Sequence, residues 1–264
     1  MTTLLPIPRR CIWCKRTEPE AAFTSESHVL ANAVGNVLQA LPPGIVCDQC
    51  NQYYGSKIEP WLLDDPLFHA RAVVVGLVDP EDMNAFRGKM FDERHPPVGQ
   101  VIRKLHLDIG LSGQRLTLGV DYAIKGTMLR EYEPRHLASL SRAAHKIAFE
   151  SVAYSIFAKG FDGPPLDLFG PRFDSARRWA RDGTPPKPIR PVARMLTEEI
   201  NGNWLYEVWN FGADTGVGLK LFGDWYGVSL TSSPDQVLKD LWDWSGGANR
   251  SKVWIVGDSL SRPD

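Results

Sequence analysis

The sequence predicts an α+β protein in which a metal-stapled N-terminal module precedes a mixed α+β domain with antiparallel strands. Three observations support this fold class. All four cysteines of the 264-residue chain lie in the first 50 residues, as two C-x2-C pairs. Residues 135–159 have the 3.6-residue periodicity of an amphipathic helix. Short, aromatic, β-prone runs dominate residues 203–257. We therefore divide the chain into a module of residues 1–66 and an α+β domain of residues 67–264.

The two cysteine pairs, Cys11 with Cys14 and Cys47 with Cys50, predict a zinc site. Each knuckle can present two sulfurs at about 2.3 Å to a tetrahedral Zn2+. Four protein ligands leave no open position for water, so this zinc would be structural and would stabilise a segment with little apolar surface. The alternative is a set of unrelated thiols, one pair being redox-active, but the CIWC pair lacks the surrounding βαβ pattern of such proteins.

Two residues beside the cysteines have side chains suited to phosphodiester hydrolysis. His28 lies in the loop that zinc would close, and Asn51 follows Cys50 where a helix should begin. A zinc that ties Cys50 to this loop brings Asn51 near His28. An imidazole can accept a proton from water, while side-chain oxygens can hold a divalent ion that polarises the phosphate. Taken singly, the two residues also fit a structural histidine and a helix-capping asparagine.

The segments CIWC, SHVLANAVGN and CDQCNQYYG together resemble the HNH (ββα-metal) endonucleases with a four-cysteine zinc ribbon, the phage recombination endonuclease VII among them. In that family a C-x2-C pair precedes an acidic-His-Ile/Val segment, and a second C-x2-C-Asn opens the metal-binding helix. The resemblance covers about the first 60 residues and implies a zinc-ribbon ββα-metal fold for them. It implies that His28 is the general base and that Asn51 binds a catalytic Mg2+ or Mn2+.

Two features depart from the family pattern. Many relatives have an asparagine shortly before the second cysteine pair, where this chain has LPPGIV at residues 41–46, with Asn32 and Asn36 as the nearest candidates. The other departure is the residue before the histidine. The family usually has Asp or Glu directly before the histidine, as a metal ligand, whereas this chain has Ser27 there and Glu26 one residue earlier. Ser27 could bind weakly through its hydroxyl, Glu26 could reach in from a shifted backbone, or Glu59 could contribute from the helix. If none of these holds, the site is degenerate.

The net charge of −1 conceals an uneven distribution. Residues 135–194 carry eleven basic and five acidic side chains, a net of +6, and residues 195–264 carry five and ten, a net of −5. The basic segment could attract a polyanion or could be an ordinary solvated surface. Five of its side chains are candidates for contacts with nucleic-acid phosphates: Arg142, Lys146, Arg177, Arg178 and Arg181.

Beyond the module, we expect a hairpin within residues 101–124, around the Ser112-Gly113 pair. The helix at 135–159 should stop at Gly160. Residues 182–191 form a proline-rich connector. The tryptophans that follow it are expected to pack on strand faces rather than to stack on bases.

These expectations favour a metal-dependent HNH endonuclease that hydrolyses phosphodiester bonds in nucleic acid, with DNA as the expected substrate. By resemblance, its setting would be a phage or a bacterial defence or restriction system. The alternative is a non-catalytic zinc-ribbon protein that binds nucleic acid with a lapsed active site. No apolar run approaches the ~20 residues of a membrane span, and the N-terminus lacks the features of a secretory signal. We therefore expect a cytoplasmic protein without a membrane partner, and the oligomeric state stays open.

Overall fold

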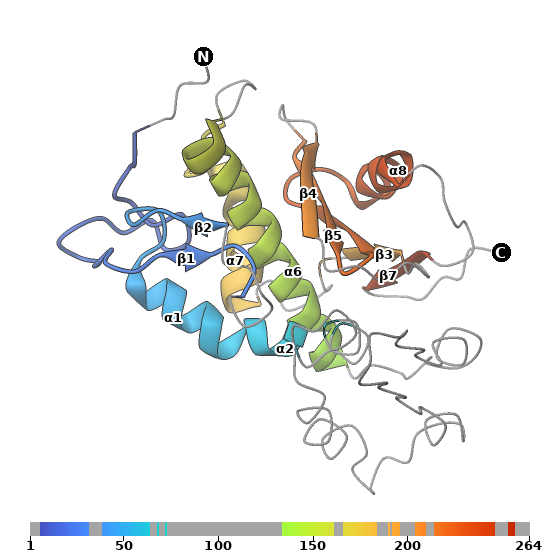
Figure 1. Ribbon diagram of the computed structural model, residues 1–264, viewed down its shortest axis with the longest axis horizontal. Coiled ribbons are helices and arrows are strands. Elements are labelled where there is room, and N and C mark those ends of the chain that lie inside the picture. The colour runs from blue at the N-terminus through green and yellow to red at the C-terminus, as the bar shows by residue number, and fades with distance from the viewer. Residues whose placement is uncertain are drawn as a thin grey trace, which may run out of the picture.

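The fold is an α+β arrangement in which one long helix separates a small N-terminal module from a C-terminal antiparallel sheet (Figure 1). The computed structural model describes residues 6–31, 39–63, 68, 72, 134–160, 166–183, 190, 192–195, 204–209, 214–245 and 253–256. The expected hairpin within 101–124 and most of the proline-rich connector lie outside these residues. No helix in the described ranges is long and apolar enough to cross a membrane.

The N-terminal module has the order strand, strand, helix. Strand β1 (Ser27–His28) pairs antiparallel with β2 (Ala40–Leu41), and helix α1 (Asp48–Lys57) follows. A second short helix, α2 (Glu59–Leu63), continues from α1. Strands of two residues cannot form a stable sheet by themselves. The module must therefore obtain its stability from the cysteine cluster and from the elements packed around it.

Helix α6 (Pro134–Tyr154) confirms the helix expected at residues 135–159, and a π-helix, η3 (Ser155–Gly160), continues it. The hydroxyls of Ser151 and Ser155 donate to the carbonyls of Ile147 and Ser151, one turn earlier, just where the helix widens. Gly160 has a φ of +75°, which ends the helix as expected.

The C-terminal sheet contains five antiparallel strands in the order β4-β5-β6-β3-β7. Their bounds are β3 (Val192–Met195), β4 (Trp204–Trp209), β5 (Gly216–Leu221), β6 (Asp224–Ser229) and β7 (Val253–Val256). The strands expected within residues 203–257 are thus confirmed, and β3 is an addition to them. Alternation along β5 explains its two faces: Val217, Leu219 and Leu221 join the core shared with α6, whereas Gly216 and Gly218 face the opposite side.

Helix α8 (Pro234–Trp244) lies on that opposite side of the sheet. We expected strands on either side of these residues and did not predict this helix. The start of α8 carries a signal that could have revealed it, because the Ser233 hydroxyl accepts from the backbone N–H of Gln236 and a proline follows Ser233. A Cβ on Gly218 would overlap the rings of Trp209 and Trp244, so glycine lets this helix approach the sheet.

The tryptophans of this region pack against the sheet, as expected. The rings of Trp225 and Trp244 meet edge to face with centroids 4.6 Å apart, and those of Trp209 and Trp244 lie 5.7 Å apart. They form a second apolar cluster with Val237 and Leu241 between the sheet and α8.

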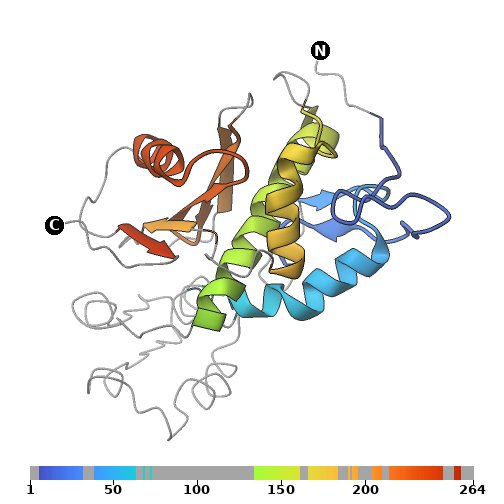
Figure 2. The same cartoon turned by 180° about the vertical axis from the view of Figure 1, so that it is seen from behind.

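The main hydrophobic core runs without interruption from the N-terminal module through α6 to the sheet. Trp13, between the first two cysteines, stacks against Phe149 of α6 with ring centroids 5.0 Å apart. Helix α7 (Asp174–Asp182), preceded by the short 3-10 helix η4 (Pro171–Phe173), lies along α6 in the view from behind (Figure 2). Helix α6 therefore packs against the N-terminal module on one side and against the sheet on the other.

We predict that a fragment of residues 1–66, supplied with zinc, does not fold as the full chain does. It would expose Trp13 and Ser27, which are buried in the whole protein and contact α6. Burial of a large aromatic side chain contributes about 2–3 kcal/mol, a large part of the stability of a small domain. Thermal melting followed by circular dichroism should show no cooperative transition for the fragment, with the full chain as control. A cooperative melt of the zinc-loaded fragment would establish it as an independent domain.

Candidate metal centre and active site

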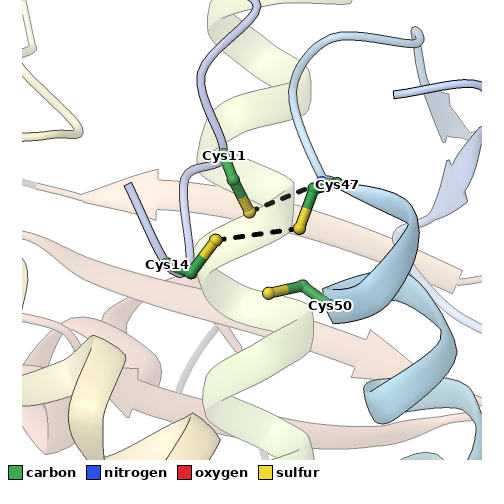
Figure 3. Close-up of side chains that lie close together, drawn as sticks. All are labelled: Cys11, Cys14, Cys47 and Cys50. Carbon is green, nitrogen blue, oxygen red and sulfur yellow. Dashed lines mark hydrogen bonds between the residues drawn. The ribbon is translucent and has the colours of Figure 1, made fainter. Parts of the chain in front are cut away.

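The four cysteine sulfurs meet at one point between the first knuckle and the start of α1 (Figure 3). All four lie within 4.8 Å of one another, and the sulfurs of Cys14 and Cys47 are 3.7 Å apart. A tetrahedron with metal–sulfur bonds of about 2.3 Å has edges of about 3.8 Å, which matches that separation. A disulfide would need about 2.05 Å. The four residues thus fit a closed zinc site, as the sequence predicts.

Nearby N–H groups point at the sulfurs. The backbone N–H of Cys47 donates to the sulfur of Cys11 over 3.4 Å, and Nε of Arg16 donates to the sulfur of Cys14 over 3.4 Å. Such donors favour the thiolate form, which is the form that binds zinc. Helix α7 supports the same knuckle, because Nε of Arg177 donates to the carbonyl of Ile12 over 2.5 Å.

Asp48, the first residue of α1, joins the helix to the loop before β1. Its carboxylate accepts from the backbone N–H groups of Thr24 and Ser25, over 2.9 and 3.0 Å, and from both of their hydroxyls, over 2.7 and 2.8 Å. These hydrogen bonds lower the pKa of Asp48 to about 2. The loop that leads to His28 is thereby attached to the helix start that the cysteines define.

Asn51 lies one turn further along α1 and contacts the same loop. Its amide nitrogen donates to the carbonyl of Glu26 over 2.9 Å and to the hydroxyl of Ser25 over 3.3 Å. With Nδ2 turned to the loop, Oδ1 is the atom that the amide can offer to a cation. The structure therefore attaches Asn51 to the residue two positions before His28.

His28 itself is half-buried at the end of β1. Its Nδ1 is enclosed and makes no hydrogen bond to any residue that the structure describes. Buried polar atoms are nearly always hydrogen-bonded in folded proteins, to protein, water or an ion. Nδ1 of His28 thus has no protein partner in the described part of the chain, and a water or an ion would have to supply one.

The three oxygen-bearing residues considered in place of an acidic residue at position 27 have different environments. Ser27 is buried, and its hydroxyl donates to Oε2 of Glu150 on α6 over 3.1 Å. Glu59 directs Oε1 to the ammonium of Lys146, 2.5 Å away. Glu26 is exposed, and its carbonyl already contacts Asn51. Of the three, Glu26 alone has a carboxylate at the surface of this region with no ion pair among the described residues.

The expected phosphate contacts divide into structural and surface residues. The expectation that Lys146 and Arg177 contact phosphates was wrong. Both side chains are buried, and they pair with carboxylates and carbonyls of the protein. The guanidinium of Arg142 is also occupied by contacts within the protein, since Nε donates to the carbonyl of Ala180 and Nη2 to the hydroxyl of Tyr53. Arg178 is exposed and Arg181 half-buried on α7, so these two stay available.

Sequence reasoning missed the buried polar cluster on α6. Lys146 and Glu150 have i, i+4 spacing, which is typical of a solvated face, yet both are almost completely buried. Trp13 Nε1 donates to Glu150 Oε1 over 2.9 Å, beside the hydrogen bond from Ser27. No pattern in the sequence joins residues 13 and 27 to residue 150, so only the folded chain could reveal the cluster.

We predict that the purified protein contains about one zinc per chain and that Cys47→Ser abolishes zinc binding and unfolds the module. The serine hydroxyl is a poor zinc ligand. The loss of one sulfur releases the start of α1, so Asp48 and Asn51 no longer hold the loop before β1. Metal analysis together with near-ultraviolet circular dichroism measures both effects, and Ser56→Ala on the exposed side of α1 is the matched control. A wild-type protein that is folded and free of zinc would contradict the assignment.

The comparison with protein families agrees with this geometry. The model of the family described as HNH endonuclease matches residues 11–67, a segment that contains both cysteine pairs, His28 and Asn51. No curated protein and no solved structure matches the chain, so the closer likeness to phage endonuclease VII stays a prediction. Residues 11–67 thus match the model of the HNH endonuclease family, and this segment contains a four-cysteine cluster positioned to bind a metal ion.

Proposed function

We propose that this protein is a metal-dependent endonuclease that hydrolyses phosphodiester bonds in nucleic acid, with DNA as its substrate. The observation that carries the proposal is the orientation of Asn51. Its amide nitrogen is held by the loop before His28, on a helix whose start the cysteines fix, and its oxygen is left for a cation. The match of residues 11–67 to the HNH endonuclease family supports the same chemistry.

In this proposal His28 is the general base. Its imidazole takes a proton from the attacking water, which then adds to the phosphorus as the 3′-oxygen leaves, giving a 5′-phosphate and a 3′-hydroxyl. A bound Mg2+ or Mn2+ supplies positive charge that stabilises the phosphate and the leaving oxygen. Oδ1 of Asn51 holds that ion, and hydrogen bonds to Ser25 and Glu26 prevent the amide from rotating.

We assign the carboxylate of the ion site to Glu26 rather than to Ser27 or Glu59. Hard divalent ions prefer several oxygen ligands, including at least one carboxylate. Glu26 is exposed beside Asn51, whereas Ser27 is directed to Glu150 and Glu59 is paired with Lys146. A carboxylate that must leave an ion pair to bind a metal would do so at a cost in free energy.

Arg178 and Arg181 are the proposed phosphate contacts outside the module. They lie on α7, and the carbonyl of Arg181 accepts from the hydroxyl of Tyr53 on α1 over 2.6 Å, so α7 borders the helix that carries Asn51. Contacts of this kind are independent of sequence and weaken as salt is added. A cytoplasmic setting in phage or bacterial defence or restriction stays our expectation from the resemblance.

A nicking assay on supercoiled plasmid tests the function. With Mg2+ or Mn2+ the wild type should cut, while His28→Ala and Asn51→Ala should each lose about a hundredfold or more in rate and keep their zinc and fold. Asn51→Asp keeps an oxygen but loses the donors to Ser25 and Glu26, so it should recover only part of the rate. If the wild type and His28→Ala both bind DNA and neither cuts, the protein is the non-catalytic zinc-ribbon binder instead.

We also predict that placing the family's acidic residue at position 27 destabilises the protein and does not improve the ion site. Ser27→Asp would place a second carboxylate beside buried Glu150, and like charges in a buried site oppose ionisation, so the variant should lose on the order of 3 kcal/mol of stability. Urea unfolding measures this. Ser27→Ala, which loses one hydrogen bond, should lose about 1 kcal/mol.

The cleavage rates of the Ser27 variants and of Glu26→Gln show which residue supplies the carboxylate of the ion site. Glu26→Gln should need more Mg2+ for the same rate, whereas Ser27→Ala should not. A stable Ser27→Asp protein that cuts faster than the wild type would place the ion at position 27 and not at Glu26.

A further inference from the structure

The ammonium of Lys146, on α6, joins three parts of the N-terminal module. It donates to the carbonyls of His28 over 2.6 Å and Val29 over 3.2 Å, and it contacts Glu59 of α2 at 2.5 Å and Glu150 of its own helix at 3.1 Å. The side chain of Lys146 is 1% exposed and that of Glu150 is fully buried. A buried ammonium is tolerated only when its donors are all used, and here they are.

The contact with His28 closes the open edge of β1. The N–H of Val29 donates to the carbonyl of Gln39 on the β2 side, over 3.0 Å. Because adjacent residues of an antiparallel strand direct their backbone groups to opposite sides, the carbonyl of His28 points away from β2. Within the described ranges, no backbone N–H donates to that carbonyl, and the ammonium of Lys146 is its partner. The ammonium thus takes the place of a further strand beside a sheet only two residues long.

The two carboxylates keep the ammonium charged and in place. Burial alone would lower the pKa of Lys146, but the charges of Glu150 and Glu59 outweigh that effect and the pKa is raised. Burial raises the pKa of Glu150, and Lys146 together with the Trp13 indole N–H opposes that rise. Glu150 also receives the hydroxyl of Ser27, so consecutive residues of β1 are attached to consecutive turns of α6.

We propose that Lys146 is a positioning residue of the nuclease site and that α6, far from the module in sequence, determines where the His28 imidazole lies. This inference rests on the proposed function. The direction of a side chain is set by the backbone that carries it, and Lys146 holds the backbone of His28 itself. Its ammonium contacts the backbone carbonyls of His28 and Val29 and two carboxylates, so its effect on the imidazole is through the backbone. A displacement of about 1 Å at a catalytic group can lower a rate about a hundredfold.

The test compares Lys146→Met, whose side chain is unbranched, uncharged and one atom shorter, with Lys146→Met/Glu150→Gln, which also removes the buried negative charge left behind. Glu150→Gln keeps an oxygen that accepts from the Trp13 indole, and its amide nitrogen can donate to the Ser27 hydroxyl in place of the present hydrogen bond, so the double variant should fold even where the single variant does not. Lys239→Met, an exposed lysine on α8, is the matched control. All variants are measured at full length and loaded with zinc.

We expect the double variant to bind zinc and DNA as the wild type does, with KM within about twofold and kcat about a hundredfold lower. Amide hydrogen exchange of residues 27–30 should become faster, with the exchange of β5 and β6 unchanged. Lys239→Met should alter neither quantity. A folded double variant with the kcat of the wild type, or with unchanged exchange at residues 27–30, would overturn the proposal, as would failure of the double variant to fold, since Lys146 would then be required for the whole fold.

Hydrogen exchange also separates this proposal from the proposed function. If the wild type fails to cut DNA but residues 27–30 lose protection in the double variant, the endonuclease assignment fails and the attachment of β1 to α6 stands. If the wild type cuts and the double variant cuts equally well, the endonuclease assignment stands and the role of Lys146 fails.

Discussion

The N-terminal module depends on one constraint. The four cysteine sulfurs must come together as the corners of a single tetrahedron around a metal ion. The module has two-residue strands and a ten-residue helix, and none of these is stable alone in water. Once the knuckle at Cys11 is joined to the start of α1, Asp48 can hold the loop before β1 and Asn51 can face it. The contacts that Asp48 and Asn51 make with this loop thus follow from that one closure.

Helix α6 is the second support, and its two sides have different chemistry. Towards the module it presents Phe149, Lys146 and Glu150. Towards the sheet it presents His145, whose Nδ1 lies 2.7 Å from the carbonyl of Ser141 and whose Nε2 accepts from Arg190 over 3.3 Å. Burial and the charge of Arg190 lower the pKa of His145 to about 3. This histidine is therefore neutral and structural, whereas the charged cluster lies on the side that faces the candidate active site.

The serine at position 27 is explained by this arrangement. A carboxylate already lies within one hydrogen bond of that position, but it comes from Glu150 of α6 and is paired with Lys146. Negative charge beside residue 27 serves to attach β1 to the helix, and the neighbouring Glu26 is left at the surface beside Asn51. A departure from the family pattern that suggests a lapsed site is thus also consistent with a site whose acidic residue has moved by one position.

By itself the sequence determined the α+β class, the cysteine cluster, the helix that became α6 and most strands of the sheet, and it proposed His28 and Asn51 as site residues. These features depend on local periodicity or on short spacings, which a sequence displays directly. Only the tertiary structure decided that Lys146 and Arg177 are buried, that Ser27 faces Glu150 and that Asn51 directs its nitrogen to Glu26. The physical reason is that these roles depend on partners more than twenty residues away, and in the case of Arg177 and Ile12 as many as 165. A basic side chain has the same sequence signature whether it meets solvent, a phosphate or a buried carbonyl, so its partner is known only once the chain has folded.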